Sequence, residues 1–378
     1  MEIYLDNSAT TKPMKPAIDA CVHVMEEEYG NPSSLHKLGF QAEKLLNTSK
    51  LELSKALSCD SSEIYFTSGA TESNNLAIIG GAMAHKRKGN KIITSAIEHP
   101  SVKEAMKYLE AQGFEITEVM PNEKGEYEAS AFANEVDDKT ILVSCMYVNN
   151  EMGLILPVDQ ISKAVKMQNP NTLVHVDAVQ AFMKIPIKLK NSGIDLMSMS
   201  GHKIYAPKGI GALYIKKGTR ILSQSFGGPQ QGGMRSGTEA MPLIASFAAA
   251  VKEQSENLNH QLKHYQELEE YLLTKLDPIA DVTINSSPNA VPYIVNISVA
   301  NIRSEVMLHF LEQFGIYISS GSACSKGKHS YVLSALGIDK KRADSAIRIS
   351  FGLDTTKEML DIFVEKLQEG IATLAKTR

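Results

Sequence analysis

The most informative stretch for the fold is Thr172-Leu173-Val174-His175-Val176-Asp177, a short and mostly apolar run that ends in a carboxylate. A strand that is apolar along most of its length is typical of a sheet covered on both faces. Amphipathic stretches, such as residues 73–88 and 158–167, separate this run from others of its kind. This alternation predicts an α/β fold with a largely parallel sheet. The other strand candidates are residues 63–67, 91–94, 140–144 and 211–215.

A second domain is expected beyond a long helix that begins near residue 245. From residues 245 to 276 the pattern is that of one long helix, whose apolar residues step by three or four positions. Beyond it come three more strand candidates, and a length of 378 residues favours two domains. We expect a large domain of residues 16–255 and a smaller α+β domain of residues 1–15 and 256–378. The apolar stripe is Leu258, Leu262, Tyr265, Leu268, Leu272 and Leu276, and the strand candidates are residues 293–299, 315–319 and 346–350.

Composition excludes several classes of protein. An apolar share of 43%, a charged share of 22% and a net charge of −4 fit a globular protein without the basic stripe of a nucleic-acid binder. The N-terminus lacks the features of a signal peptide, and no uncharged apolar stretch approaches the roughly 18 residues that span a bilayer. The cysteines show no C-x-x-C spacing, which argues against a metal site and a disulfide framework. We therefore expect a cytoplasmic protein without direct nucleic-acid or membrane contacts.

Two residues fit the chemistry of pyridoxal phosphate. Lys203 follows a strand and the small residues 198–201, so it can reach a cofactor aldehyde at the carboxyl edge of a sheet. Asp177 ends a buried strand, where a carboxylate needs a positive partner such as the protonated pyridine nitrogen of that cofactor. Taken alone, Lys203 can also be a surface residue, and Asp177 can equally cap the end of its strand.

Two further segments suit the same ligand. Residues 66–75 run from a strand through small residues into a helix start, where free N–H groups can hold a phosphate. The alternative is a simple helix N-cap. His99 stands at the exit of a strand before a helix that starts with proline, and it can stack on a planar ring and move protons. A lone histidine can also be structural.

The amino-acid sequences of seven segments, together with their order along the chain, indicate a family. The chain resembles the NifS/IscS-like cysteine desulfurases of the class V aminotransferase superfamily, and the resemblance extends from residue 4 to residue 350. It implies fold type I of the pyridoxal-phosphate enzymes, with a mostly parallel seven-stranded sheet and a smaller α+β domain. The segments are FTSGATESNNLA (66–77), EHPSV (98–102), VNNEMG (148–153), HVDAVQ (175–180), SGHKIYAPKGIGALY (200–214), GGMRSGT (232–238) and SSGSAC (319–324).

The resemblance also implies a role for each matching residue. Lys203 is expected to form the Schiff base with pyridoxal 5′-phosphate, and Asp177 to pair with the pyridine nitrogen. Gln180 is expected to bond the phenolic oxygen, and His99 to stack on the ring and act in acid–base steps. The expected cofactor-binding set is Ala70, Thr71, His99, Asn150, Asp177, Gln180, Ser200, His202, Lys203 and Thr238.

Phosphate and substrate contacts follow from the same resemblance. Thr71, Ser200 and His202 are expected to hold the phosphate, with Thr238 reaching in from a partner subunit of a homodimer. Asn150 and Arg348 are expected to bind L-cysteine, and a bidentate grip on its carboxylate suits arginine better than lysine.

Cys324 is the expected sulfur acceptor, which makes His99, Lys203 and Cys324 the catalytic set. Residues 321–330 are small and polar, as in a mobile exposed loop, and the nearby basic side chains favour the reactive thiolate. The implied reaction turns L-cysteine into alanine and leaves a persulfide on Cys324; the alternative is an incidental exposed cysteine. We expect Cys21, Cys59 and Cys145 to be structural.

The expected partner is a sulfur-acceptor protein of iron–sulfur cluster assembly, tRNA thiolation or thiamine synthesis. Residues 325–330 form a shorter segment than in the long-loop branch of the family, and the chain ends soon after a helix predicted for residues 356–375. Both features make a dedicated acceptor, such as a tRNA-thiolation or thiamine-pathway protein, at least as plausible as a scaffold. Rival interpretations are a selenocysteine lyase or a transaminase, and a non-catalytic sulfur-relay subunit. The relay subunit is disfavoured because Lys203, Asp177 and Cys324 are all present.

Overall fold

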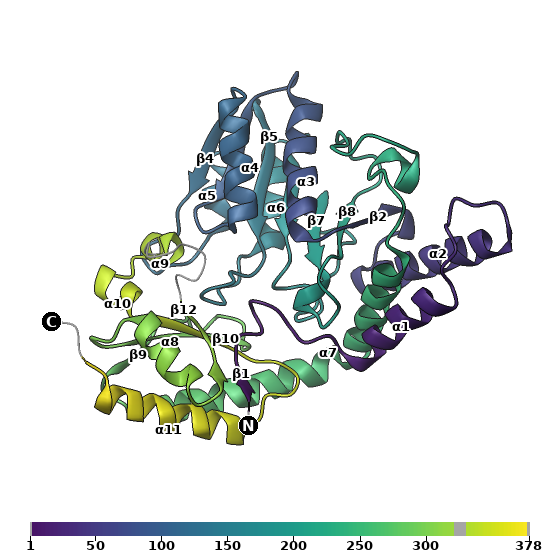
Figure 1. The fold of residues 1–378 in the computed structure, drawn as a ribbon. Coiled ribbons are helices and arrows are strands. Elements are labelled where there is room, and N and C mark those ends of the chain that lie inside the picture. Colours follow the sequence, from purple (N-terminus) through teal and green to yellow (C-terminus); the bar gives the residue numbers. More distant parts are fainter. Residues whose placement is uncertain (1, 321–329, 376–378) are drawn as a thin grey trace.

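A seven-stranded sheet forms the centre of the larger half of the molecule. The computed structural model describes residues 2–320 and 330–375 (Figure 1). Only β8 runs antiparallel to its neighbours, so the α/β class and the largely parallel sheet expected from the sequence are confirmed. In spatial order the strands are β2 (Ile64–Thr67), β8 (Gly211–Ile215), β7 (Leu196–Ser200), β6 (Leu173–Asp177), β5 (Thr140–Met146), β3 (Lys91–Ser95) and β4 (Glu115–Val119).

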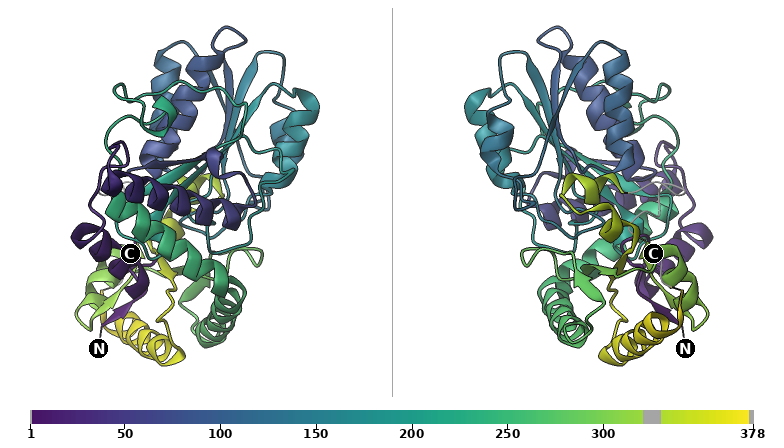
Figure 2. Two further views of the ribbon diagram at one scale, coloured as in Figure 1. Left: turned by 90° about the vertical axis from the view of Figure 1, so that its right-hand side faces the viewer. Right: turned by 90° about the vertical axis from the view of Figure 1, so that its left-hand side faces the viewer.

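Helices cover both faces of this sheet, as the edge-on view on the left of Figure 2 shows. Leu142 packs into the cluster formed with α3 (Ala70–His85) and α4 (Pro100–Ala111), while its neighbour Val143 packs into the cluster on the other face. This alternation is what an apolar run must produce in a strand, whose successive side chains point to opposite faces. The second face is covered by α6 (Val158–Gln168) and by the first part of α7 (Met241–Leu276). The short helix α5 (Ala129–Ala133) packs against α6.

A smaller antiparallel sheet lies beside the long helix α7. Its order is β12 (Ser319–Ser320), β13 (Ala346–Ser350), β10 (Ile294–Val299) and β9 (Val282–Ile284). The strand predicted for residues 315–319 is divided at Ile318, because β11 (Ile316–Tyr317) pairs with β1 (Ile3–Tyr4) while β12 pairs with β13. The helices of this half are α8 (Ser304–Glu312), α9 (Tyr331–Ala335), α10 (Lys340–Asp344) and α11 (Lys357–Thr373).

Helix α7 connects the two halves, as the sequence suggested. It packs against α1 (Lys15–Glu26) and α2 (Lys37–Leu57) near its start and also contacts α11. The predicted apolar stripe is buried from Tyr265 to Leu276 but only half-buried at Leu258 and Leu262. Because α7 is one continuous helix across residues 255 and 256, the domain boundary there stays a prediction. None of the helices in residues 2–320 and 330–375 is long and apolar enough to cross a membrane.

The topology gathers several functional segments at one edge. Strands β6, β7 and β3 are mutually parallel through β5, so their carboxyl ends meet at the same edge of the sheet. Asp177 and Ser200 end two of these strands, and His99 follows the third by four residues. The carboxyl edge of an open α/β sheet is where ligands bind in such folds.

Close backbone approach at Gly211 fixes one side of this edge. A Cβ atom on Gly211 would lie 2.6 Å from the carbonyl oxygen of Met199 and 2.7 Å from the Cα of Gly69, the residue that precedes α3. We expect Gly211→Ala to lower the free energy of unfolding by about 1–3 kcal/mol, because backbone atoms cannot move aside as a side chain can. Urea unfolding measures the change. Gly81→Ala is the control, since its nearest neighbour is the movable Leu173 side chain at 3.3 Å; an equal loss in both variants would contradict the argument.

Candidate active site

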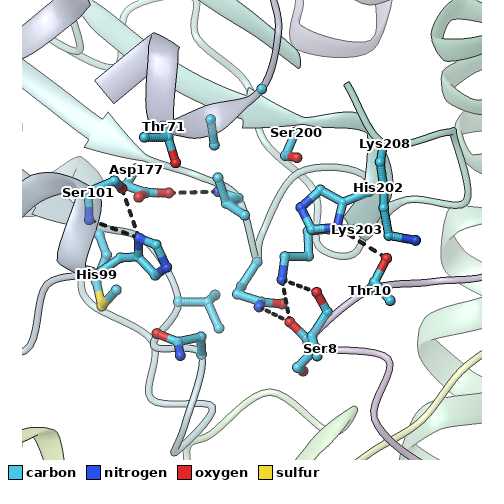
Figure 3. A pocket seen from close by; sticks show the side chains of 18 of the residues that line it. Ser8, Thr10, Thr71, His99, Ser101, Asp177, Ser200, His202, Lys203 and Lys208 are labelled. Carbon is cyan, nitrogen blue, oxygen red and sulfur yellow. Dashed lines mark hydrogen bonds between the residues drawn. The ribbon is translucent and has the colours of Figure 1, made fainter. Parts of the chain in front are cut away.

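A cavity of about 720 Å³ opens at the carboxyl edge of the large sheet (Figure 3). Its volume is in the range of small-molecule sites. Its wall includes the N-terminal segment around Ser8, the starts of α3 and α4, the ends of β6 and β7, the segment that follows β5, and the small sheet with Arg348. The cavity therefore lies where the two sheets face each other.

Lys203 projects into this cavity from the short 3-10 helix η2 (Gly201–Lys203), directly after β7. Its Nζ donates to the carbonyl oxygens of Ser8 and Ala9 at 2.6 and 2.7 Å. The N-terminal segment is fixed to η2, since the N–H of Thr11 donates to the carbonyl of His202 at 2.9 Å. Lys203 is thus half-buried and oriented by the backbone, unlike a lysine in a surface loop.

Asp177 is 5% exposed at the end of β6, where the sequence predicted it. Its Oδ1 accepts from the N–H of Val179 at 3.0 Å, and its Oδ2 accepts from Asn74 Nδ2 at 2.8 Å. It therefore does cap the end of its strand, and it also lines the cavity. Both donors are neutral groups, whereas a buried carboxylate is best stabilised by a cation. The arrangement fits a ligand that brings a positive atom to Asp177.

His99 is the N-cap of α4 and lies at the opposite side of the cavity from Lys203 (Figure 3). Its Nδ1 accepts from the backbone N–H of Ser101 at 3.1 Å. Burial lowers the pKa of the imidazole; the charge of Asp177 opposes this shift, and the charge of Lys203 adds to it. The ring is therefore neutral at pH 7, and because Nδ1 is an acceptor its proton lies on Nε2.

Asn74 connects these residues and was not predicted from the sequence as a site residue. It is fully buried in α3, and its Nδ2 donates both to Asp177 and to Ser101 Oγ, the latter at 2.9 Å. Ser101 Oγ lies 2.8 Å from His99 Nδ1. One amide group thus holds the relative positions of the carboxylate and the imidazole.

The start of α3 provides an anion site. Its first-turn N–H groups have no partners within the helix, and no side chain of Gly69 can cap them. Ser200 Oγ is buried against the same cavity without a hydrogen-bond partner in the described residues. His202 binds Thr10 through Nδ1 at 3.2 Å, and burial followed by the charge of Lys203 lowers its pKa to about 4. These groups are neutral donors with room for a phosphate between them.

Arg348 is the cation on the opposite wall. It lies in the middle of β13, is 7% exposed, and donates through Nη2 to Asp6 Oδ1 at 2.7 Å and through Nη1 to the carbonyl of Asn150 at 2.8 Å. Two of its five N–H groups are used in this way. The remaining donors leave it able to grip a carboxylate in the cavity, with its plane fixed by the two contacts.

Comparison with known proteins shows the family to which the chain belongs. The family model described as Aminotransferase class-V matches residues 3–363. The cysteine desulfurase IscS of Dictyoglomus turgidum is 38% identical over 377 residues, which cover 99% of this chain and 95% of the relative. The chain belongs to the aminotransferase class-V family, beside the cysteine desulfurases.

Solved structures agree with this assignment. A NifS-like protein aligns with a TM-score of 0.94 at 37% identity, over 99% of this chain and 100% of that chain. A structure of SspA in complex with cysteine aligns with a TM-score of 0.81 at 30% identity, over 93% and 99% of the two chains. Enzymes of the family depend on pyridoxal 5′-phosphate, and the protein is one of them. The buried Ser200 hydroxyl, the start of α3 and the Asp177 carboxylate fit the phosphate and the ring nitrogen of that cofactor.

The structure brings most of the predicted site residues of this family together. Thr238 does not line the cavity of its own chain and is exposed, and Cys324 lies outside the described residues. Ten others line the same cavity: Ala70, Thr71, His99, Asn150, Asp177, Gln180, Ser200, His202, Lys203 and Arg348.

Three cysteines contrast with the expected acceptor. Cys145 is buried in β5, and Cys21 and Cys59 are half-buried. Burial raises the pKa of all three thiols, to about 12 for Cys59. None of these three is a thiolate at neutral pH, so none has the reactive form that a sulfur acceptor of this family needs.

Glu98, next to His99, was also missed, because a glutamate in a polar sequence reads as a surface residue. It is fully buried; its Oε1 accepts from the N–H of Met146 at 2.7 Å and from Ser95 Oγ, and its Oε2 has no partner in the described residues. Burial raises its pKa to about 8, and the charge of Asp177 adds to the shift. Glu98 is therefore a neutral carboxylic acid at pH 7.

This protonation predicts a pH dependence of stability. Between the ordinary value of 4.5 and about 8, folded Glu98 keeps a proton that the unfolded chain has lost. Stability therefore falls as pH rises across this range, by up to roughly 1.4 kcal/mol per pH unit from this group. Glu98→Gln, which keeps the shape and the acceptor oxygen, is expected to flatten the slope. Urea unfolding at pH 5, 6, 7 and 8 measures it, and parallel curves for the two proteins would refute the assignment.

Proposed function

We propose that the protein is a cysteine desulfurase that converts L-cysteine into alanine and passes the sulfur to Cys324 as a persulfide. One observation carries the proposal: Lys203, Asp177 and Arg348, from three separate strands or strand ends, line one cavity. An amine, a carboxylate for a ring nitrogen and a guanidinium for a carboxylate are what an amino-acid substrate and pyridoxal phosphate require. The related structure of SspA in complex with cysteine supports cysteine as the amino acid.

Each residue has a step that its contacts support. The bound cofactor supplies an electron sink for the α-carbon of the substrate. Lys203 Nζ takes the α-proton, and the carbonyls of Ser8 and Ala9 are placed to stabilise the ammonium group that results. Arg348 holds the carboxylate through N–H groups that Asp6 and Asn150 leave available.

His99 acts as a proton shuttle in this scheme. Its neutral ring carries the proton on Nε2, because Nδ1 accepts from the N–H of Ser101. Nε2 can give this proton to the reacting group and can then accept one from the substrate thiol. Because burial lowers the pKa of the ring, it is neutral at pH 7, and Nε2 acts first as a donor and accepts only after it has given up its proton.

Sulfur transfer requires the Cys324 thiolate. Its sulfur attacks the sulfur of cysteine, the carbon–sulfur bond breaks, and the released electron pair takes a proton at carbon, which gives alanine. Cys324 lies outside the described residues, but Ser319 and Ser320, which precede its segment, line the cavity. We also propose, as the sequence predicts, a cytoplasmic location and delivery of the persulfide to an acceptor protein of iron–sulfur assembly, tRNA thiolation or thiamine synthesis.

The working form is proposed to be a homodimer. Thr238 is exposed and lies outside the cavity of its own chain, which fits a residue that serves the cavity of a second copy. Large apolar side chains are exposed on and between α1 and α2 and in the loop after β8, both on the right side of Figure 1. Large apolar side chains exposed in this number on one side of a molecule fit a surface that is covered by a partner. The side chains are Met25, Tyr29, Leu35, Phe40, Leu222 and Phe226.

Cys324→Ala tests the acceptor directly. We expect the purified wild type to be yellow from bound cofactor and to release alanine and sulfide from L-cysteine in the presence of a thiol reductant. The variant should keep the colour and lose at least about 99% of alanine formation, because no other described cysteine has a low thiol pKa. Cys59→Ala is the matched control and should retain activity. Equal alanine formation by wild type and Cys324→Ala would exclude Cys324 as the acceptor.

Thr238→Ala tests the contribution of a partner subunit. Loss of a hydrogen bond to the phosphate should weaken cofactor binding about tenfold. Lys203→Ala inactivates the cavity of its own chain but keeps Thr238. A mixed dimer of the two variants therefore contains one complete cavity, with Lys203 from one subunit and Thr238 from the other. After exchange of subunits, cofactor affinity and alanine release should recover in about half of the mixed dimers' cavities. If mixing restores nothing although light scattering shows dimers, Thr238 does not act across the interface.

A further inference from the structure

Lys184 is a buried amine that the proposed reaction does not use. It is 6% exposed and lies in the turn that follows β6 and Gln180. Its Nζ lies 3.4 Å from Gln180 Oε1 and 5.0 Å from the centre of the Tyr293 ring. Lysine is rarely buried to this degree without a carboxylate, and no ion pair of Lys184 occurs among the described residues. Its contacts with the amide and the aromatic ring are therefore the interactions that hold it.

These contacts fix the orientation of the Gln180 amide. Gln180 Nε2 donates to the carbonyl oxygen of Ser8 at 2.9 Å, and a carbonyl can only accept. A protonated Lys184 can only donate, so the amide oxygen must face it. The contact with Ser8 and the contact with Lys184 therefore require the same assignment of the amide oxygen and nitrogen.

This orientation leaves one N–H group of Gln180 unused. The amide nitrogen has two hydrogens, and Ser8 takes one of them. Gln180 lines the cavity, and the second hydrogen is available to an acceptor there. Tyr293 strengthens the arrangement, because its hydroxyl donates to the backbone carbonyl of Gln180 at 2.8 Å while its ring packs under Lys184.

We propose that Lys184 is a positioning residue that holds the Gln180 amide with its N–H toward the phenolic oxygen of the cofactor. This role rests on the proposed function, in which Gln180 faces that oxygen. Without Lys184 the amide oxygen is a buried acceptor that lacks a donor, which is unfavourable by itself. Ser8 alone then holds the amide, so the N–H that faces the cofactor is less firmly placed and the hydrogen bond to the phenolic oxygen is weakened.

The amine is suited to this position at neutral pH. Burial, followed by repulsion from Lys203 and Arg348, lowers the pKa of Lys184 to about 7. An amine has N–H groups in both protonation states, so a donor to the amide oxygen is present on either side of pH 7. The partial loss of charge limits the repulsion between Lys184 and the cation at Lys203.

Absorption of the bound cofactor tests the proposal, because a donor to the phenolic oxygen stabilises its negative charge. In Lys184→Met, we expect the pH midpoint of the change in the absorption band to move upward by roughly one unit, and the dissociation constant of the cofactor to rise about tenfold. Lys184→Gln, a milder polar replacement, is measured beside it. Lys188→Met is the matched control, since Lys188 is exposed four residues away, and it should change neither value.

A double-variant comparison decides whether Lys184 acts through Gln180. In a Gln180→Ala background, replacing Lys184 should no longer move the absorption midpoint. A shift of the same size in that background would overturn the proposal, because Lys184 would then act directly through its charge. Variants with lower thermal stability but an unchanged absorption midpoint would overturn it as well, since that result describes a purely structural residue.

The same experiment separates this inference from the proposed function. If the wild type binds pyridoxal phosphate and releases alanine while the Lys184 variants match it in absorption, only the role of Lys184 is wrong. If the wild type itself gains no absorption band with pyridoxal phosphate, the proposed function fails first.

Discussion

The hydrogen bonds from Lys203 Nζ to the carbonyls of Ser8 and Ala9 are the contacts on which the site depends. They fasten the N-terminal segment across the carboxyl edge of the large sheet. The same segment reaches the small sheet, where Asp6 binds Arg348 and the N–H of Ser8 donates to Ser350 Oγ. One short piece of chain thereby sets the distance between the group expected to react with the cofactor and the group expected to hold the substrate.

Several buried polar side chains around the cavity are uncharged at neutral pH or are bound to uncharged partners. Burial lowers the pKa of His99, His202 and Lys184 and raises that of Glu98. Each shift removes charge from a region where a charge is costly. The cavity therefore concentrates its remaining charge on a few side chains, notably Asp177 and Arg348, at positions where a zwitterionic substrate and a charged cofactor can meet them. Selective burial of this kind is common where a site must bind charged ligands.

The sequence was informative where function depends on side chains at strand ends. Asp177 ends a strand that the sequence shows clearly, and Lys203 was expected just after a strand at the carboxyl edge of the sheet, although the bounds of that strand, β7, were not among the strand candidates. The carbonyls of Ser8 and Ala9 could not be predicted, because backbone groups leave no trace in residue type. The strand at residues 315–319 was predicted as one, yet Ile318 divides it between two sheets, and such a change of partner depends on tertiary contacts rather than on local pattern. Cys324, the residue with the most distinctive sequence context, lies outside the described residues.

Pairing of β1 with β11 has a consequence for how the protein is made. These strands are separated by more than 300 residues, and the bond between Ser8 and Ser350 spans 342 residues. A ribosome has therefore to synthesise the chain past Ser350 before this wall of the cavity can close. Contacts of such long range form late in folding. A nascent chain that ends before Ser350 lacks these contacts, so the N-terminal segment can be fixed against the small sheet only after that residue has been made.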